Sequence, residues 1–262
     1  MNYEALLELA TNAAYAAGEE ILNVYNSGEI VVDFKVDSSP LTIADQHAQL
    51  AIVAGLQSSG IPILSEEADE IPYDQRSKWE RFWMVDPLDG TKEFIQRNGE
   101  FTVNIALMQH NEPVLGVVYA PVTDKLWYGG TDLGYSAVKE GETTRRLTTI
   151  KTRNLNKLYQ IKNVNIITSR FHQNLETTDF IRPFDEPSLL TMGSSLKFML
   201  LAQGDADVYP RFAPTMEWDT AASDAILRAV NRGIYQVNAM NEITVPLQYN
   251  KINLRNPYFI AI

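Results

Sequence analysis

The segment 82–91, with the sequence FWMVDPLDGT, joins an apolar run to a turn that carries two carboxylates. The apolar run predicts a buried strand, and the proline and glycine between and after the carboxylates favour a tight turn. Such a turn can direct Asp86 and Asp89 at one point, and a helix that begins near Thr91 presents free backbone N–H groups to the same point. Carboxylates bind hard cations and N–H groups bind anions, so the segment indicates a metal-assisted phosphate site, with a plain solvated turn as the alternative.

The bulk composition limits the class of protein. A chain of 262 residues with 45% hydrophobic and 10% aromatic residues has enough apolar material for one compact body or two closely packed halves. No apolar run is long enough to span a bilayer, and the absence of cysteine excludes disulfides, thiol catalysis and zinc–thiolate sites. We therefore expect a cytoplasmic protein without a transmembrane segment, and peripheral association with the inner face of the membrane stays open.

The chain is acidic, with a formal net charge of −11 at pH 7. Nucleic-acid binding needs a basic surface, so we expect no nucleic-acid partner. The same charge argues against anionic substrates, unless bound divalent cations reverse the local sign. For most of the surface acids, the excess charge is explained by solubility alone.

The order of the predicted elements divides the chain into two halves. Residues 1–150 contain two helices, over 3–26 and 41–57, and an antiparallel meander between 101 and 128 that a Gly129-Gly130 break ends. The polar stretch 143–155 is the best boundary. In residues 151–262, strands and helices alternate, which argues for an α/β layer.

Further acidic segments lie near the ends of predicted elements. The string SEE at 65–67 ends a short strand, WDTAA at 218–222 begins a helix, and KVDSSPLTIAD at 35–45 forms a strand, a turn and a helix. Each has an ordinary structural explanation, such as an acid that favours the helix dipole or Thr42 as a cap.

Taken together, the SEE, DPLDGT and WDTAA strings resemble the lithium-sensitive, magnesium-dependent phosphatases of the inositol monophosphatase superfamily. Within it, residues 86–107 and the GSSLKF and YPRF strings at 193–198 and 209–212 are similar to the CysQ-type 3′(2′),5′-bisphosphate nucleotidases. Inositol monophosphatases usually carry threonine and asparagine where this chain has Lys92 and Glu93. The resemblance implies a layered α/β fold, an αβαβα sandwich, with the active site between the halves.

The resemblance also implies the roles of individual residues. It implies two or three magnesium ions, held by the carboxylates or the backbone carbonyl of Glu66, Asp86, Leu88, Asp89 and Asp219. It implies that Asp45 and Thr91, with Glu66, position and activate the attacking water. The substrate contacts that it implies are Gly90, Thr91, His172, Ser194, Lys197, Arg211 and Asp219.

The activity that the resemblance implies is removal of the 3′-phosphate from adenosine 3′,5′-bisphosphate, and its sulfated analogue is a further substrate candidate. This reaction belongs to nucleotide recycling and sulfur metabolism, and we expect a monomer or homodimer. The alternatives are an inositol or sugar monophosphatase and a catalytically silent metal- and nucleotide-binding module. Structural alternatives also stay open for the substrate contacts. Lys197 can be a solvated helix lysine, Arg211 can pair with Asp207, and His172 can close a turn.

Overall fold

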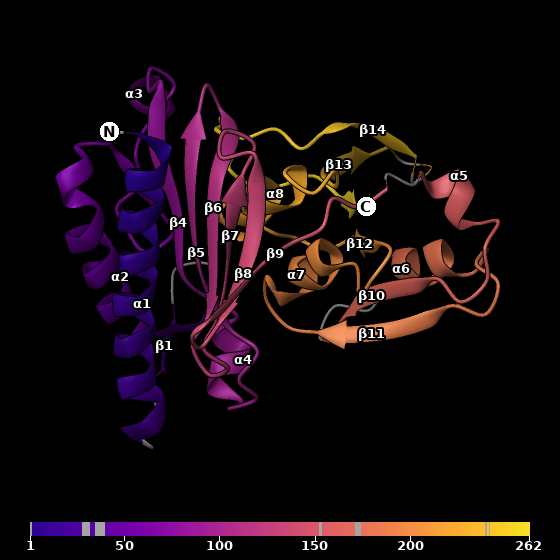
Figure 1. Ribbon diagram of the computed structural model, residues 1–262, viewed down its shortest axis with the longest axis horizontal. Coiled ribbons are helices and arrows are strands. Elements are labelled where there is room, and N and C mark those ends of the chain that lie inside the picture. The colour runs from indigo at the N-terminus through magenta and orange to yellow at the C-terminus, as the bar shows by residue number, and fades with distance from the viewer. Residues whose placement is uncertain are drawn as a thin grey trace.

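The protein is built from alternating layers of helix and sheet (Figure 1). The computed structural model describes residues 2–27, 32–34, 40–151, 154–170, 174–238, 240 and 242–262. Helices α1 (Tyr3–Ser27) and α2 (Ile43–Leu56) cover one face of a large sheet. Helices α7 (Leu196–Gln203) and α8 (Ala221–Arg228) lie between its other face and a second β layer, and short helices follow beyond that layer. The predicted αβαβα sandwich is therefore confirmed.

The first half of the chain supplies the large sheet. In the described residues its strands lie side by side in the order β3 (Ile63–Ser65), β4 (Arg81–Asp89), β5 (Thr102–Gln109), β6 (Glu112–Ala120), β7 (Lys125–Gly130), β8 (Tyr135–Glu140) and β9 (Thr143–Arg146). Strands β3 and β4 are parallel, and the later neighbours are antiparallel. A separate antiparallel pair consists of β1 (Val32–Phe34) and β2 (Pro40–Thr42). The short helices of this half are η1 (Gln57–Ser59), α3 (Tyr73–Arg76) and α4 (Thr91–Ile95).

The structure confirms the N-terminal helix and the meander, and it corrects the predicted end of the meander. Gly129 and Gly130 do not break the sheet, because both lie within β7. They allow close approach instead: a Cβ atom on Gly130 would lie 2.0 Å from the carbonyl oxygen of Val114 on the neighbouring chain segment. The polar residues 143–146, which carry no apolar alternation, form the exposed edge strand β9.

The second half builds the other β layer. The antiparallel sheet has the order β12 (Tyr209–Arg211), β15 (Phe259–Ala261), β13 (Ile234–Val237) and β14 (Ile243–Pro246), and β10 (Asn165–Ser169) pairs in parallel with β11 (Ser188–Met192). The short helices are α5 (Leu155–Leu158), α6 (Leu175–Ile181) and η2 (Glu217–Asp219). The predicted strand at 206–209 lies three residues later, as β12, and the predicted helix from 219 begins as η2 before α8.

Helix α8 joins the two halves by packing directly on the large sheet. Gly116 of β6 makes this approach possible, because a Cβ atom there would lie 2.0 Å from the carbonyl oxygen of Ala222. Buried side chains of α7 and α8 form one core with residues from both sheets. The division into 1–150 and 151–262 stays a prediction. Among the described residues, no helix is both long enough and apolar enough to cross a membrane.

Candidate active site

The end of strand β4 carries the two carboxylates of the DPLDGT turn. The strand is longer than predicted, because pairing with β5 resumes at Asp89 after an irregularity that starts at Asp86. The Asp86 side chain accepts a hydrogen bond from the backbone N–H of Leu88, 3.1 Å away, which stabilises the bulge. Gly90 then adopts a φ of 95°, and Thr91 begins helix α4 as the sequence predicted.

Three of the predicted metal ligands converge. Single carboxylate oxygens of Glu66, Asp86 and Asp219 all lie within 4.8 Å of one another. Burial raises the pKa of Asp86 well above its usual range, and the charges of Glu66 and Asp89 act in the same direction. Burial likewise raises the pKa of Asp219. A cluster of carboxylates that repel one another fits a hard divalent cation, which takes oxygen ligands and removes the repulsion.

Asp89 lies beside this cluster, and side chains of the second half hold it. Its Oδ2 atom accepts hydrogen bonds from Ser194 Oγ (2.7 Å) and Ser195 Oγ (2.8 Å), and Asn104 Nδ2 lies 3.4 Å away. Ser195 Oγ also lies 3.1 Å from the backbone oxygen of Asp219. The start of α7 therefore fixes a carboxylate of the first half to the turn that carries Asp219.

Asp45 and Thr91 meet although many residues separate them. Thr91 Oγ1 lies 3.4 Å from Asp45 Oδ1 and 3.5 Å from the backbone oxygen of Leu88. Asp45 is buried at the first turn of α2, where its Oδ2 accepts from the backbone N–H (2.6 Å) and hydroxyl (2.7 Å) of Thr42. This capping box fixes the orientation of the Asp45 carboxylate, so that its other oxygen faces Thr91.

A cavity of about 270 Å³ collects most of the predicted site residues. Its lining includes Glu66, Asp86, Leu88, Asp89, Gly90, Thr91, Ser194, Lys197, Arg211 and Asp219. Asp45 stands behind Thr91, outside this lining. The remaining predicted contact, His172, lies outside the described residues.

Two cations, Lys197 and Arg211, line the same cavity as the carboxylates. Lys197 is only 7% exposed, so it is not the solvated helix lysine that was one alternative. Burial lowers its pKa to about 8, while Asp89 acts in the opposite direction. Arg211 Nη2 donates to the backbone oxygen of Pro214 at 3.2 Å, and its buried Nε atom has no partner among the described residues. Asp207, the alternative partner of Arg211, accepts a hydrogen bond from the backbone N–H of Asn165.

The structure brings into the site several residues for which the sequence predicts no role. Ser195 and Asn104 hold Asp89, and Asn104 Nδ2 also donates to Ser195 Oγ at 2.9 Å. Glu93 is buried in the cavity lining, where burial and the charge of Asp89 raise its pKa. The signal available in the sequence was position alone: Glu93 follows the DPLDGT string, and Ser195 follows the predicted contact Ser194.

Comparisons with known proteins identify relatives of the chain by sequence and by structure. A sequence model of the inositol monophosphatase family matches residues 2–252. The chain is 42% identical over 236 residues to the 3′(2′),5′-bisphosphate nucleotidase CysQ of Shigella flexneri, an alignment that covers 88% of this chain and 90% of that protein. With CysQ of Haemophilus influenzae it shares 33% over 264 residues, covering 99% and 93%. The crystal structure of CysQ from Bacteroides thetaiotaomicron matches with a TM-score of 0.82 at 41% identity, over 99% of this chain and 97% of that one.

Proposed function

The chain belongs to the inositol monophosphatase family, and we propose that it is a 3′(2′),5′-bisphosphate nucleotidase that converts adenosine 3′,5′-bisphosphate to AMP and phosphate. One observation supports this substrate above the others. A single cavity is lined by the carboxylates and also by the two cations Lys197 and Arg211. A substrate with two phosphates suits such a lining, because one phosphate can meet the metal held by the carboxylates and the other can meet the cations.

The carboxylates would hold magnesium. We assign Glu66, Asp86, Asp89, Asp219 and the backbone oxygen of Leu88 as its ligands. Magnesium, when bound, offsets the charge of the phosphate dianion and stabilises the leaving alkoxide. The site has no cysteine or histidine among these ligands, and an all-oxygen set is the one that magnesium prefers.

Thr91 and Asp45 would move the proton of the attacking water. The Thr91 hydroxyl donates toward Asp45 Oδ1, so an Oγ1 lone pair can accept a proton from a water in the cavity as Thr91 passes its own to Asp45. The water oxygen forms the new bond to phosphorus, the bond from phosphorus to the ribose O3′ breaks, and O3′ takes up a proton. Backbone N–H groups at Gly90 and Thr91 would orient the phosphate. No covalent intermediate is needed.

The alternatives differ in what they require of the site. The substrate of an inositol or sugar monophosphatase has one phosphate, which the metal side binds, so this function does not require the cations Lys197 and Arg211 in the cavity. A silent binding module has no need of water activation, whereas Asp45 and Thr91 are both present and within 3.4 Å. The cytoplasmic location and the monomeric or homodimeric state stay predictions.

The test is phosphate release from a panel of substrates, with and without magnesium and with added lithium. The panel is adenosine 3′,5′-bisphosphate, its sulfated analogue, inositol 1-phosphate and fructose 1,6-bisphosphate. We expect magnesium-dependent, lithium-suppressed release that is fastest with adenosine 3′,5′-bisphosphate. Full activity in a chelator would remove the metal mechanism, and faster release from inositol 1-phosphate would replace the nucleotidase assignment with the first alternative.

A further inference from the structure

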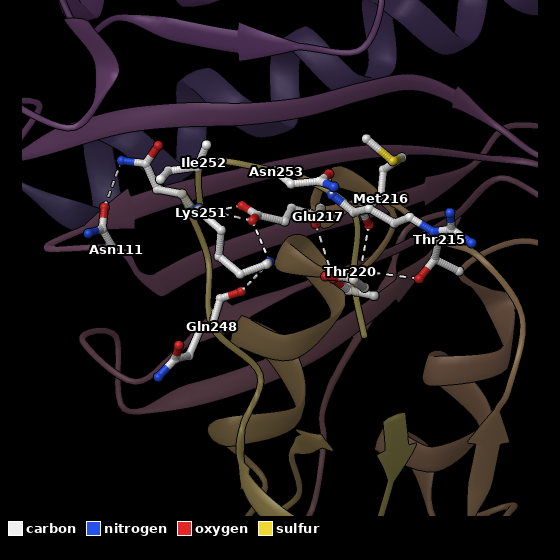
Figure 2. A network of polar contacts seen from close by, with 12 residues as sticks. Asn111, Thr215, Met216, Glu217, Thr220, Gln248, Lys251, Ile252 and Asn253 are labelled. Carbon is white, nitrogen blue, oxygen red and sulfur yellow. Dashed lines mark hydrogen bonds and ion pairs between the residues drawn. The ribbon is translucent and has the colours of Figure 1, made fainter. Parts of the chain in front are cut away.

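A network of polar contacts surrounds Glu217 in η2, the same short helix that carries Asp219, and Figure 2 shows Glu217 directed toward Lys251. At its centre is Glu217, whose side chain has no exposed surface. Its Oε2 atom accepts from the backbone N–H of Asn250 at 2.5 Å, and its Oε1 atom accepts from the backbone N–H (3.2 Å) and the ammonium (2.5 Å) of Lys251. Its own backbone N–H donates to the carbonyl of Leu254 at 2.9 Å. Glu217 thus connects η2 to the segment 250–254 through both its side chain and its backbone.

The same segment is held from the first half of the chain by Arg76. This guanidinium is 3% exposed and donates to Asn250 Oδ1 (2.5 Å), to the backbone oxygens of Lys251 (2.6 Å) and Ile252 (3.0 Å), and to that of Ile71 (3.3 Å). Ile71 belongs to the loop that follows Glu66. Arg76 therefore ties the Glu66 loop to the chain segment that Glu217 holds from the other side.

Stability alone does not explain such a network. A buried ion pair is expensive to desolvate, and apolar residues of similar size are often as stable or more so. Unlike apolar packing, this network fixes the orientation of the chain segments that it joins, because each hydrogen bond sets an angle as well as a distance. The chain segments that it joins, the loop after β3 and η2, carry Glu66 and Asp219, whose carboxylate oxygens lie within 4.8 Å and repel each other.

We propose that Glu217, supported by Arg76 and Asn250, is a positioning residue that holds Asp219 in place against Glu66 so that both can bind one cation. This inference rests on the proposed function, because it assumes that the carboxylate cluster binds metal. Asp219 lies two residues after Glu217 in η2, and its Oδ2 atom accepts from the backbone N–H of Met216 at 2.8 Å. A rotation of η2 would therefore move the Asp219 carboxylate out of the cluster.

The test is direct titration of the whole protein with Mn²⁺ alone, followed by calorimetry, for the wild type and Glu217→Gln. Glutamine keeps the shape of the side chain, but its amide nitrogen cannot accept from the backbone N–H groups. We expect Mn²⁺ affinity to fall roughly 10–100-fold, the usual loss when a group that orients a metal ligand is removed. The magnesium concentration that gives half-maximal phosphate release should rise by the same factor.

The matched control is Asp224→Asn. Asp224 is also fully buried and paired, with Arg228 (2.9 Å) and Tyr249 (3.0 Å), but it does not line the cavity. Both variants should unfold at lower temperature, and only Glu217→Gln should bind Mn²⁺ more weakly. If Glu217→Gln does not fold, Arg76→Lys keeps the charge, loses the planar fork and takes its place with the same expected direction.

Two failures can be told apart. Wild-type Mn²⁺ affinity in the folded Glu217→Gln protein, or in Arg76→Lys where that is the variant measured, overturns the positioning role and leaves the proposed function intact. A wild-type protein that binds no Mn²⁺ and releases no phosphate overturns the proposed function itself.

Discussion

Replacing Arg211 with alanine is expected to lower kcat/KM for a nucleotide with two phosphates and to leave it almost unchanged for a nucleotide that has only the reacting phosphate. Arg211 lines the same cavity as the carboxylates and keeps a buried Nε donor without a partner in the described part of the chain, so it offers a ready contact to an anion. Loss of a charge-assisted hydrogen bond typically costs about 1.5–3 kcal/mol, which is roughly a 10–150-fold fall in kcat/KM. We expect this fall for adenosine 3′,5′-bisphosphate and almost none for adenosine 3′-monophosphate, which has the same nucleoside and reacting phosphate but lacks the second phosphate.

The charge state of the neighbouring Lys197 determines how large the loss of kcat/KM is within this range. The pKa of Lys197 is lowered to about 8 by burial, so Lys197 is charged below that pH and loses its charge as the pH rises through it. At pH 7 it can still compensate for the missing guanidinium, and the loss should lie near the lower end. At pH 9 it cannot, and the loss should approach the upper end. In the wild type, KM for the bisphosphate should rise over the same interval.

The assay is kcat/KM for both nucleotides at pH 7 and pH 9, for the wild type, Arg211→Ala and Arg182→Ala. Arg182 is an exposed arginine on the surface of the second half, paired with Asp179 at 2.6 Å, and its removal should change neither substrate. Equal falls for both nucleotides in Arg211→Ala would refute the reasoning, because they would place Arg211 in support of the part of the site that both substrates share.

Three further predictions concern the metal side and the scaffold. Asp89→Asn should lower kcat far more than Glu67→Gln, because we assign Asp89 and not Glu67 as a metal ligand. Glu67→Gln should cost no more than roughly 10–100-fold, and a larger loss in Glu67→Gln than in Asp89→Asn would show that the metal ligand was assigned to the wrong carboxylate. Because the folded-state pKa values of Asp86 and Asp219 are raised, the metal-free protein should gain stability as the pH falls below neutral, whereas stabilisation by Mg²⁺ should shrink. Both trends should be smaller in Asp86→Asn, and melting curves that show them undiminished in this variant would contradict the assignment to Asp86. Gly116→Ala should lower the unfolding free energy, measured by urea titration, by about 1–3 kcal/mol, because its Cβ would lie 2.0 Å from a backbone oxygen of α8. Gly233→Ala is the control and should lower it less, because its Cβ would lie 3.1 Å from a tyrosine hydroxyl that can move away.

The parts of the fold that local pattern determines could be predicted from the sequence. Helix α1 shows a clear stripe of buried apolar residues, and the meander alternates and is interrupted by turn residues, so both were found with nearly the right bounds. The turn at 86–91 was also readable, because its carboxylates lie within one short segment. Strand β15 was missed, since three buried apolar residues are too few to show a periodicity, although β15 lies between β12 and β13.

The sequence allowed the types of residue in the site to be predicted, but not the contacts between them. Asp45 and Thr91 were named together only through the resemblance, because no local pattern links residues from α2 and α4. The bonds from Ser195 and Asn104 to Asp89 were not anticipated at all. Serine and asparagine are common on loops and strands, and their polar role becomes visible only when burial removes water as their alternative partner.

The start of α7 connects the two chemical functions of the cavity. Ser194 and Ser195 hold the Asp89 carboxylate on the metal side, and Lys197, two residues later, lines the same cavity. The net charge of −11 does not prevent an acidic chain from binding an anion, since Lys197 and Arg211 line the cavity and a bound divalent cation would reverse the local sign beside the carboxylates.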